Sequence, residues 1–294
     1  MKRKLNPGYI YIFPAVLIMV LLIGYPLIYN ISLSFKDVTL ANLAGNDQPF
    51  VGFKNYIELF NHELFPVALK NTFLFTIGSI AFQFIIGFAL ALFFSMNFKL
   101  ANFLRGVMMV SWLVPLTVTA MLFQFLLSPS VGLLNHIPIY FGWIEEPIAW
   151  LSLPEYAMWG IIITNIWIGV PFNMLLLATG LNNLPKDVYE AAQIDGATWI
   201  QRFRHITLPL LKPVIMIVMM LGFIYTFKVF DLVYVMTGGG PANSTQVLST
   251  LSYQFSFQNF NFGLGASVAN VLFVILLIIS IIYIKMTDED EVAS

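Results

Sequence analysis

The chain contains six apolar stretches, and each is long enough to cross a lipid bilayer as a helix, which takes about 20 residues. They cover about residues 10–33, 72–94, 107–127, 156–181, 214–236 and 264–284. Charged residues make up 10% of the chain and the mean hydropathy is +0.83, whereas an average soluble domain has about a quarter of its residues charged. The sequence therefore predicts an all-α integral membrane protein with six transmembrane helices in a single domain, residues 1–294.

The distribution of lysine and arginine predicts which side of the membrane each loop faces, because cytoplasmic loops carry an excess of these residues. Ten of the fourteen lie in the head at residues 2–4, in the turn 95–106, in the segment 184–213 and at Lys285. The loops on the opposite side hold only Lys36, Lys54 and Lys70. Both termini and the segment 184–213 are therefore expected in the cytoplasm.

The composition argues against several classes of function. A net charge of −1 does not suit a nucleic-acid partner, which calls for a clustered basic excess. Cysteine is absent and the three histidines are not spaced as a metal pair, so no metal site is expected. The chain has no G-x-x-x-x-G-K-[ST] phosphate loop and no nucleophile–base pattern, so we expect neither an enzyme nor a bound cofactor. Gly238–Pro241 is instead predicted to be a sharp turn on the outer side.

One long segment, about 184–213, is neither membrane-length apolar nor a simple polar connector. Pro185 suits the first turn of a helix, and Gly196 suits its end. Thr198 and Gln201, three residues apart, fit a capping box that starts a second helix. The segment is therefore predicted to be a helical hairpin between the fourth and fifth spans.

The residues of this hairpin resemble a known signature. Glu190-Ala191-Ala192 is followed after three residues by Gly196, after nine more by Ile206, and then by Leu208-Pro209. This spacing resembles the EAA motif in the coupling loop of binding-protein-dependent ABC-importer permeases. The resemblance implies a type I ABC-importer permease fold, with the loop docked on a cytoplasmic ATPase through Glu190, Ala191, Ala192, Asp195, Gly196, Ile206, Leu208 and Pro209. An amphipathic connector lying on the membrane is the alternative interpretation of the same composition.

The resemblance extends beyond the hairpin, over about residues 10–285. Trp167–Phe172, Phe230–Pro241 and Asn243–Thr245 are similar to the corresponding stretches of carbohydrate-uptake permeases. The match is closest to the group that contains the maltose and multiple-sugar permeases. The loop after the first span lacks the large extracytoplasmic insertion of the maltose permease, so the contacts of that insertion with a binding protein are not expected here.

The resemblance also implies where a sugar is held within the membrane. Counted outward from the hairpin, the implied positions are Gly169, Phe172 and Leu175 in the fourth span and Gly222, Thr226 and Val229 in the fifth. Spacings of three and four residues are predicted to place each set on one helix face. Asn173 and Tyr225 lie beside these positions and are further polar candidates. Ordinary helix packing through small residues is the alternative.

Two ionisable residues, Lys228 and Asp231, fall inside the fifth apolar stretch. Charged side chains within a span are costly and usually face a bundle interior or a wet cavity. Three residues apart on one helix, the two can also form a self-neutralising pair near the outer end of the span. A place beside a translocation path and a purely structural pair are both open.

The resemblance implies one subunit of an ATP-driven oligosaccharide importer in a prokaryotic cytoplasmic (inner or plasma) membrane. The implied partners are a homologous second permease in a heterodimer, two ATP-binding cassette subunits that hold ATP and Mg²⁺, an extracytoplasmic solute-binding protein and membrane lipid. A permease for glycerol phosphate or another polar solute is an alternative. A proton-coupled secondary carrier is an alternative of a different class, but it should show internal repeats and paired membrane carboxylates, which the sequence lacks.

The hairpin must be rigid to transmit a movement. Substitutions at its corner, Gly196, and at the carboxylate of Glu190 therefore test its role in coupling. Gly196→Pro or Glu190→Lys is expected to abolish sugar uptake and its coupling to ATP hydrolysis, while membrane insertion stays intact. Uptake and ATPase assays of the assembled complex, with the amount of protein in the membrane fraction measured in parallel, test this expectation. Normal uptake in both variants would contradict the role assigned to the loop.

Overall fold

The structure is a computed structural model that describes residues 8–45, 47–96 and 98–292. Within these ranges it is helical, and its extended pairings are two isolated bridges, Lys36 with Phe50 and Thr39 with Asn261. The prediction of an all-α fold is confirmed. The basic head at residues 2–4 lies outside the described residues, as do the side chains of the acidic tail at 288–291.

The chain divides into two compact units, which are described separately. The first contains Met1–Pro66 and Leu251–Val274, and the second contains Val67–Thr250 and Ile275–Ser294. Three helices pass from one unit to the other: α4 (Leu64–Ser95), α13 (Leu248–Tyr253) and α14 (Phe262–Val292). The expectation of one permease domain over the whole chain stays a prediction.

The first unit begins with a long apolar helix. This helix consists of α1 (Gly8–Met19), a π-turn (Val20–Gly24) and α2 (Tyr25–Ser34). The same unit contains another π-turn (Gln254–Gln258), which follows α13. None of the most apolar window of the first helix is buried inside the structure. A helix that is apolar all round requires an apolar environment, so its surface is suited to lipid or to another membrane helix.

A buried asparagine holds the polar loop that follows α2. Asn55, in α3 (Lys54–Asn61), is 5% exposed, and its Nδ2 donates to the carbonyl oxygens of Ser34 and Lys36 at 2.8 and 2.9 Å. A Cβ atom on Gly263 would lie 2.4 Å from the Lys36 carbonyl oxygen. The start of α14 can therefore approach this loop only because residue 263 has no side chain.

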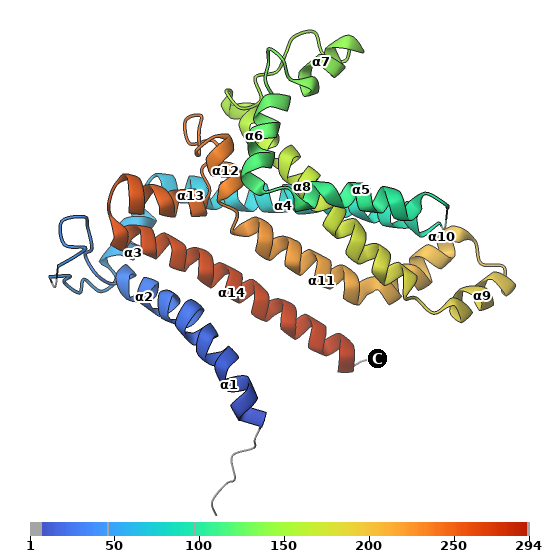
Figure 1. Ribbon diagram of the computed structural model, residues 1–294, viewed down its shortest axis with the longest axis horizontal. Coiled ribbons are helices and arrows are strands. Elements are labelled where there is room, and N and C mark those ends of the chain that lie inside the picture. Colours follow the sequence, from blue (N-terminus) through green and yellow to red (C-terminus); the bar gives the residue numbers. More distant parts are fainter. Residues whose placement is uncertain (1–7, 46, 97, 293–294) are drawn as a thin grey trace, which may run out of the picture. The chain divides into compact units, whose positions relative to one another are not determined.

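The second unit is a helical bundle built around α8 (Pro154–Asn182). Its other helical segments are α4, α5 (Ala101–Leu113), α6 (Leu116–Leu126), α7 (Leu133–Tyr140), α9 (Lys186–Ile194), α10 (Trp199–Arg202), a π-turn (Phe203–Thr207), α11 (Leu208–Phe227) and α12 (Asp231–Met236). Helices α5, α6, α11 and α12 all contact α8 (Figure 1). Of the candidate spans, α8 has the most buried apolar window, at 56%, which makes it the centre of the bundle.

Apolar side chains pack against both halves of α8. One cluster includes Phe123 of α6, Ile162 of α8 and Leu232 of α12. A second cluster includes Met174 of α8 and Leu211 of α11. Between the two clusters, Asn165, Gly169 and Asn173 of α8 line a cavity in the bundle.

Two of the predicted spans are interrupted. Helices α5 and α6, which cover the predicted stretch 107–127, are bent by 97°. Val114 at the bend is extended, with φ −70° and ψ 132°, because it precedes a proline. The predicted stretch 214–236 is helical only up to Phe227 and again from Asp231. The described part of the chain thus has five helices able to span a membrane, or up to six if the bent pair counts as one.

The predicted sharp turn after α12 is present and is anchored by one amide. Gly238 and Gly239 have φ values of +61° and +94°, a left-handed backbone that favours glycine. Asn71 of α4 is 8% exposed, and it holds the segment that follows the turn. Its Nδ2 donates, at 3.4, 3.1 and 3.0 Å, to the carbonyl oxygens of Asn243, Ser244 and Gln246.

Asn71→Leu keeps the approximate size of the side chain but removes this shared donor. A buried polar group left without a partner costs about 1–3 kcal/mol, so the variant is expected to lose about that much stability. Thermal unfolding of the detergent-solubilised protein, followed by tryptophan fluorescence, measures the change. Asn61→Leu, at an exposed position, is the matched control and should change stability little. Equal stability of the Asn71 variant and the parent protein would contradict the anchoring role.

Candidate functional site

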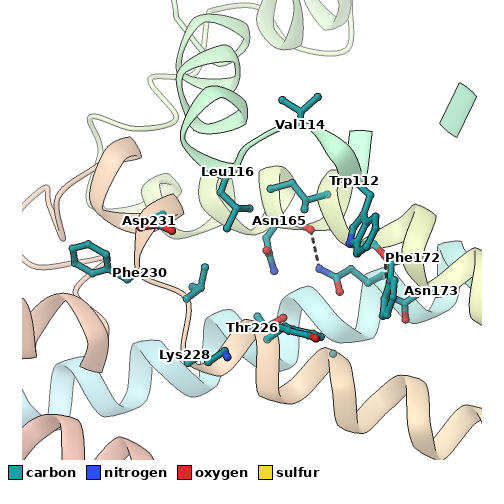
Figure 2. A pocket seen from close by; sticks show the side chains of 16 residues that line it. Trp112, Val114, Leu116, Asn165, Phe172, Asn173, Thr226, Lys228, Phe230 and Asp231 are labelled. Atoms are coloured by element: carbon teal, nitrogen blue, oxygen red, sulfur yellow. Dashed lines mark hydrogen bonds between the residues drawn. The ribbon is translucent and has the colours of Figure 1, made fainter. Parts of the chain in front are cut away.

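A cavity of about 530 Å³ lies within the second unit, in the hollow beside the middle of α8 (Figure 2). Its wall is formed by α4, α8 and α11 together with the two helix interruptions. The lining residues are Gln83, Trp112, Val114, Leu116, Asn165, Ile168, Gly169, Phe172, Asn173, Gly222, Tyr225, Thr226, Lys228, Val229, Phe230 and Asp231. Pockets of about 300–1,000 Å³ typically hold small-molecule ligands, so this cavity is large enough to be a binding site.

Aromatic rings form two parts of the cavity wall. The rings of Trp112 and Phe172 are stacked, with centroids 5.4 Å apart and planes at 14°. The Lys228 ammonium lies 5.5 Å from the centroid of the Tyr225 ring, which is a cation–π contact. In Figure 2 the Trp112–Phe172 pair and Lys228 lie on different sides of the cavity. Flat apolar faces and polar groups are thus both presented to its interior.

Side-chain amides supply the polar part of the wall. Gln83 is 4% exposed, and its Nε2 donates to the backbone carbonyl oxygen of Asn165 at 2.8 Å. Asn173 Nδ2 donates to the Gly169 carbonyl oxygen at 2.9 Å. Asn165 is 7% exposed, and its Nδ2 has no hydrogen-bond partner within the described structure. Figure 2 shows this amide directed toward the cavity, so Asn165 places a buried donor beside it.

Gly169 is required by the close approach of Gln83. A Cβ atom at residue 169 would lie 2.3 Å from Gln83 Cδ and 2.5 Å from both of its terminal amide atoms. Real Cβ atoms do not approach other heavy atoms so closely, so a larger residue would displace the Gln83 amide. The hydrogen bond from Gln83 to Asn165 therefore depends on a glycine in the next turn of α8.

Seven of the eight positions predicted for the substrate pathway line this cavity. They are Gly169, Phe172, Asn173, Gly222, Tyr225, Thr226 and Val229. Leu175 does not line it, and the prediction that residues 169, 172 and 175 share one face is wrong. Each step of three residues turns about 60° short of a full helical turn, so two steps carry Leu175 about 120° away from Gly169.

Seven residues of the cavity wall were not predicted from the sequence: Gln83, Trp112, Val114, Leu116, Asn165, Ile168 and Phe230. A signal for the two amides was present, because both lie inside membrane-length apolar stretches, where polar side chains usually face the interior of a bundle. Trp112 carried no such signal, since a tryptophan in an apolar helix can equally face lipid. Its place in the wall depends on the bend that follows α5.

The ion pair considered for Lys228 and Asp231 does not form. Lys228 Nζ and the Asp231 carboxylate form no salt bridge within 4.0 Å in the described structure. The two residues do not belong to one helix, since α11 ends at Phe227 and α12 begins at Asp231. Residues three apart lie on one face only in a continuous helix, and the interruption between α11 and α12 removes that continuity. Both side chains instead line the cavity, where Lys228 contacts Tyr225.

The hairpin has the local structure that its sequence predicts. Its two arms meet at Gly196, which has a φ of +76°. Thr198 caps α10 with a complete capping box, in which Gln201 N–H donates to Thr198 Oγ1 and Thr198 N–H donates to Gln201 Oε1. Figure 1 shows α9 and α10 beyond the adjoining ends of α8 and α11. The hairpin therefore projects from one end of the bundle.

The residues of the EAA-like signature lie mostly on the hairpin surface. Glu190, Ala191, Asp195, Gly196 and Pro209 are exposed, and Ala192, Ile206 and Leu208 are half-buried. Large apolar side chains are exposed as well: Ile194 is 87%, Trp199 62% and Ile200 68% exposed. An apolar surface edged by carboxylates, beyond the end of a bundle, is typical of a surface that binds another protein.

Comparison with protein families identifies the class of protein. Residues 83–285 match the model of the family described as "Binding-protein-dependent transport system inner membrane component". The match covers well over half of the chain and includes every residue of the cavity wall and all of the hairpin. The chain belongs to this family of membrane transport subunits.

Relatives of known description support the assignment over nearly the whole chain. The chain is 34% identical to the trehalose/maltose transport system permease protein MalF of Thermococcus litoralis, covering 97% of this chain and 94% of the relative. It is 32% identical to the sulfoquinovosyl glycerol transport system permease protein SmoG of Agrobacterium fabrum, covering 93% and 87%. The structure is similar to a bacterial ABC transporter involved in alginate import, with a TM-score of 0.82, 23% identity and coverage of 96% and 95%. The fold is therefore that of an ABC-importer permease.

Gly169→Ala tests the close contact in the cavity wall. The added methyl group is expected to push Gln83 away from Asn165 and to cost about 1–3 kcal/mol of stability, as overpacking does. Gly106→Ala is a matched control in α5, because a Cβ there meets nothing within 4 Å. Thermal unfolding and solute uptake of both variants check the expectation. Equal behaviour of the two variants would show that Gly169 is not constrained.

Proposed function

We propose that this chain is one permease subunit of an ATP-driven, binding-protein-dependent importer for an oligosaccharide. It would form half of a translocation pathway in a prokaryotic inner membrane. The observation that carries the proposal is the cavity beside α8, which combines stacked rings with an amide donor that has no partner in the described structure.

The chemistry of this cavity suits a sugar. A pyranose presents apolar C–H faces, which pack on aromatic rings such as those of Trp112 and Phe172, and hydroxyl groups, which accept from an amide such as Asn165. Lys228 and Asp231 both line the cavity, so their formal charges cancel there. This balance favours a neutral oligosaccharide over a phosphate ester such as glycerol phosphate. The transport of trehalose and maltose by the similar Thermococcus litoralis system supports the same solute class.

The hairpin is proposed to be the contact with a cytoplasmic ATPase. Its exposed surface combines the apolar Ile194 and Ile200 with the carboxylates of Glu190 and Asp195. Apolar side chains provide burial, and carboxylates can accept charge-assisted hydrogen bonds from basic groups of a partner. The excess of lysine and arginine on the hairpin side supports a cytoplasmic position for the hairpin and for both termini.

The remaining components follow from this arrangement. ATP and Mg²⁺ would be held by two ATP-binding cassette subunits, and a homologous permease would supply the other half of the pathway. A solute-binding protein would deliver the sugar from outside. A bacterial alginate ABC transporter of similar structure has been solved in complex with a periplasmic protein that holds an alginate pentasaccharide, which supports this route of delivery. Closure of the ATPase pair would move the hairpins, and the bundle would then open its cavity toward the binding protein.

Reconstitution tests the proposal. The subunit is co-expressed with its second permease, ATPase and binding protein, purified, and placed in proteoliposomes. Uptake of labelled neutral di- and trisaccharides that bind the binding protein is expected only with ATP. Uptake of glycerol phosphate diesters in place of sugars would overturn the substrate class, and uptake by this chain without the ATPase would favour a secondary carrier.

Asn165→Leu is expected to lower sugar uptake in that assay about 2- to 10-fold, because it removes a hydrogen-bond donor from the cavity while keeping a side chain of similar size. Asn61→Leu, at an exposed position at the end of α3, is the matched control and should transport like the parent. ATPase activity without sugar measures the integrity of both complexes. Unchanged uptake by the Asn165 variant would remove this residue from the binding site.

A further inference from the structure

The first arm of the hairpin is held away from the bundle. A cavity of about 490 Å³ lies between α9 and the adjoining ends of α4 and α8. Tyr189 of α9 lines this cavity, and its hydroxyl lies 2.8 Å from Oγ1 of Thr207. Thr207 is 6% exposed, so the hydrogen bond reaches a buried partner. The Tyr189–Thr207 hydrogen bond therefore bridges a hollow that packing leaves open.

Thr207 occupies an irregular point of a long helix. The helix runs continuously from Trp199 to Phe227, and its π-turn Phe203–Thr207 contains the threonine. In this turn the Leu208 N–H donates to the Phe203 carbonyl oxygen, one residue further back than in an α-helix. Such π-turns are often found at functional sites. Tyr189 thus contacts the helix where its hydrogen-bond pattern departs from the regular one.

The hydroxyl of Thr207 has two hydrogen-bond contacts at the π-turn. Thr207 Oγ1 lies 3.4 Å from the Arg202 carbonyl oxygen and donates to it. Either hydroxyl can be the donor of the 2.8 Å hydrogen bond between Tyr189 and Thr207, which is the shorter of the two contacts. Tyr189 of α9 is in this way connected to Thr207, the last residue of the π-turn, and through its hydroxyl to the carbonyl oxygen of Arg202, which precedes the turn.

The second arm of the hairpin is fastened differently, by aromatic rings. Trp199 stacks on Phe203 with centroids 5.4 Å apart, and Phe203 lies 5.8 Å from Phe88 of α4. Phe88 in turn stacks on Phe84 at 5.7 Å, next to the cavity residue Gln83. This column holds α10 and the π-turn against the bundle. The first arm, which carries Glu190, lacks a comparable ring contact in the described structure and depends on other links.

We propose that the Tyr189–Thr207 hydrogen bond is the joint that passes movement of α9 to the cavity. The inference rests on the proposed function, in which an ATPase displaces α9. The helix that receives the movement carries Gly222, Tyr225 and Thr226 in the cavity wall. Tyr189 is therefore a positioning residue for coupling: it sets how far the cavity-lining helix follows the hairpin, and it does not itself contact the solute.

Isosteric variants test the joint in the complete reconstituted complex. Tyr189→Phe, Thr207→Val and the double variant remove the same hydrogen bond with little change in volume. The measured quantity is the number of sugar molecules imported per ATP hydrolysed. Each single variant is expected to lower this ratio about 2- to 10-fold, the effect of one lost hydrogen bond. The double variant is expected to fall no further than Thr207→Val, because that change already removes the Tyr189–Thr207 hydrogen bond.

Two further variants separate this role from general structure. Thr207→Ser retains the hydroxyl and should keep the parent ratio. Tyr140→Phe removes the hydroxyl of a tyrosine that is 85% exposed, and it should also keep the ratio. Co-purification with the ATPase is measured for every variant and is expected to be unchanged.

An unchanged ratio in both single variants would overturn the proposal, as would a double loss equal to the product of the single losses. Weaker co-purification of Tyr189→Phe with the ATPase would also overturn it, since the hydrogen bond would then serve docking. A parent complex without ATP-dependent sugar uptake is a different result, which contradicts the proposed function rather than the joint.

Discussion

Backbone hydrogen bonding is the constraint on which this structure depends. In lipid, every N–H and C=O group needs an internal partner, so the chain crosses as helices and can leave the helical conformation only where protein or a water-accessible cavity covers it. The bundle has two such interruptions, at Val114 and at Lys228–Phe230, and residues of both line the same cavity. The helix breaks and the cavity are therefore one feature. A helix break leaves backbone N–H and C=O groups without helical partners and changes the direction of nearby side chains. The cavity is the place where these groups can be accommodated.

The wall of the cavity is assembled from contacts that need several helices at once. Gln83 of α4 reaches the backbone of Asn165 only because Gly169 has no side chain in its path. Trp112 stacks on Phe172 only because α5 ends before the bend. Apolar clusters at both ends of α8 hold these helices at fixed separation. The amide of Asn165 is left with its donor facing inward, which is the kind of buried polar group that a bound solute completes.

The hairpin combines the surface proposed to bind an ATPase with tertiary contacts to the bundle that forms that wall. Its corner is set by local chemistry, a left-handed glycine and a capping box, and does not require the bundle. Its connection is tertiary: a column of rings leads from Trp199 to α4, and a hydroxyl pair joins Tyr189 to the π-turn. The rigid corner at Gly196 and the proposed Tyr189–Thr207 joint would together allow a displacement of α9 to reach the side chains that line the cavity.

The sequence by itself determined the helical membrane class, the hairpin and the family, because each depends on short-range pattern: apolar runs, capping residues and the spacing from Glu190 to Pro209. It also indicated most of the cavity wall on α8 and α11. Only the tertiary structure decided the bend at Val114, the separation of Lys228 from Asp231, the absence of Leu175 from the wall and the presence of Gln83, Trp112 and Asn165 in it. These depend on where helices end and on which helix faces meet. Hydropathy cannot show this, since lipid-facing and cavity-facing residues in a membrane helix are often equally apolar.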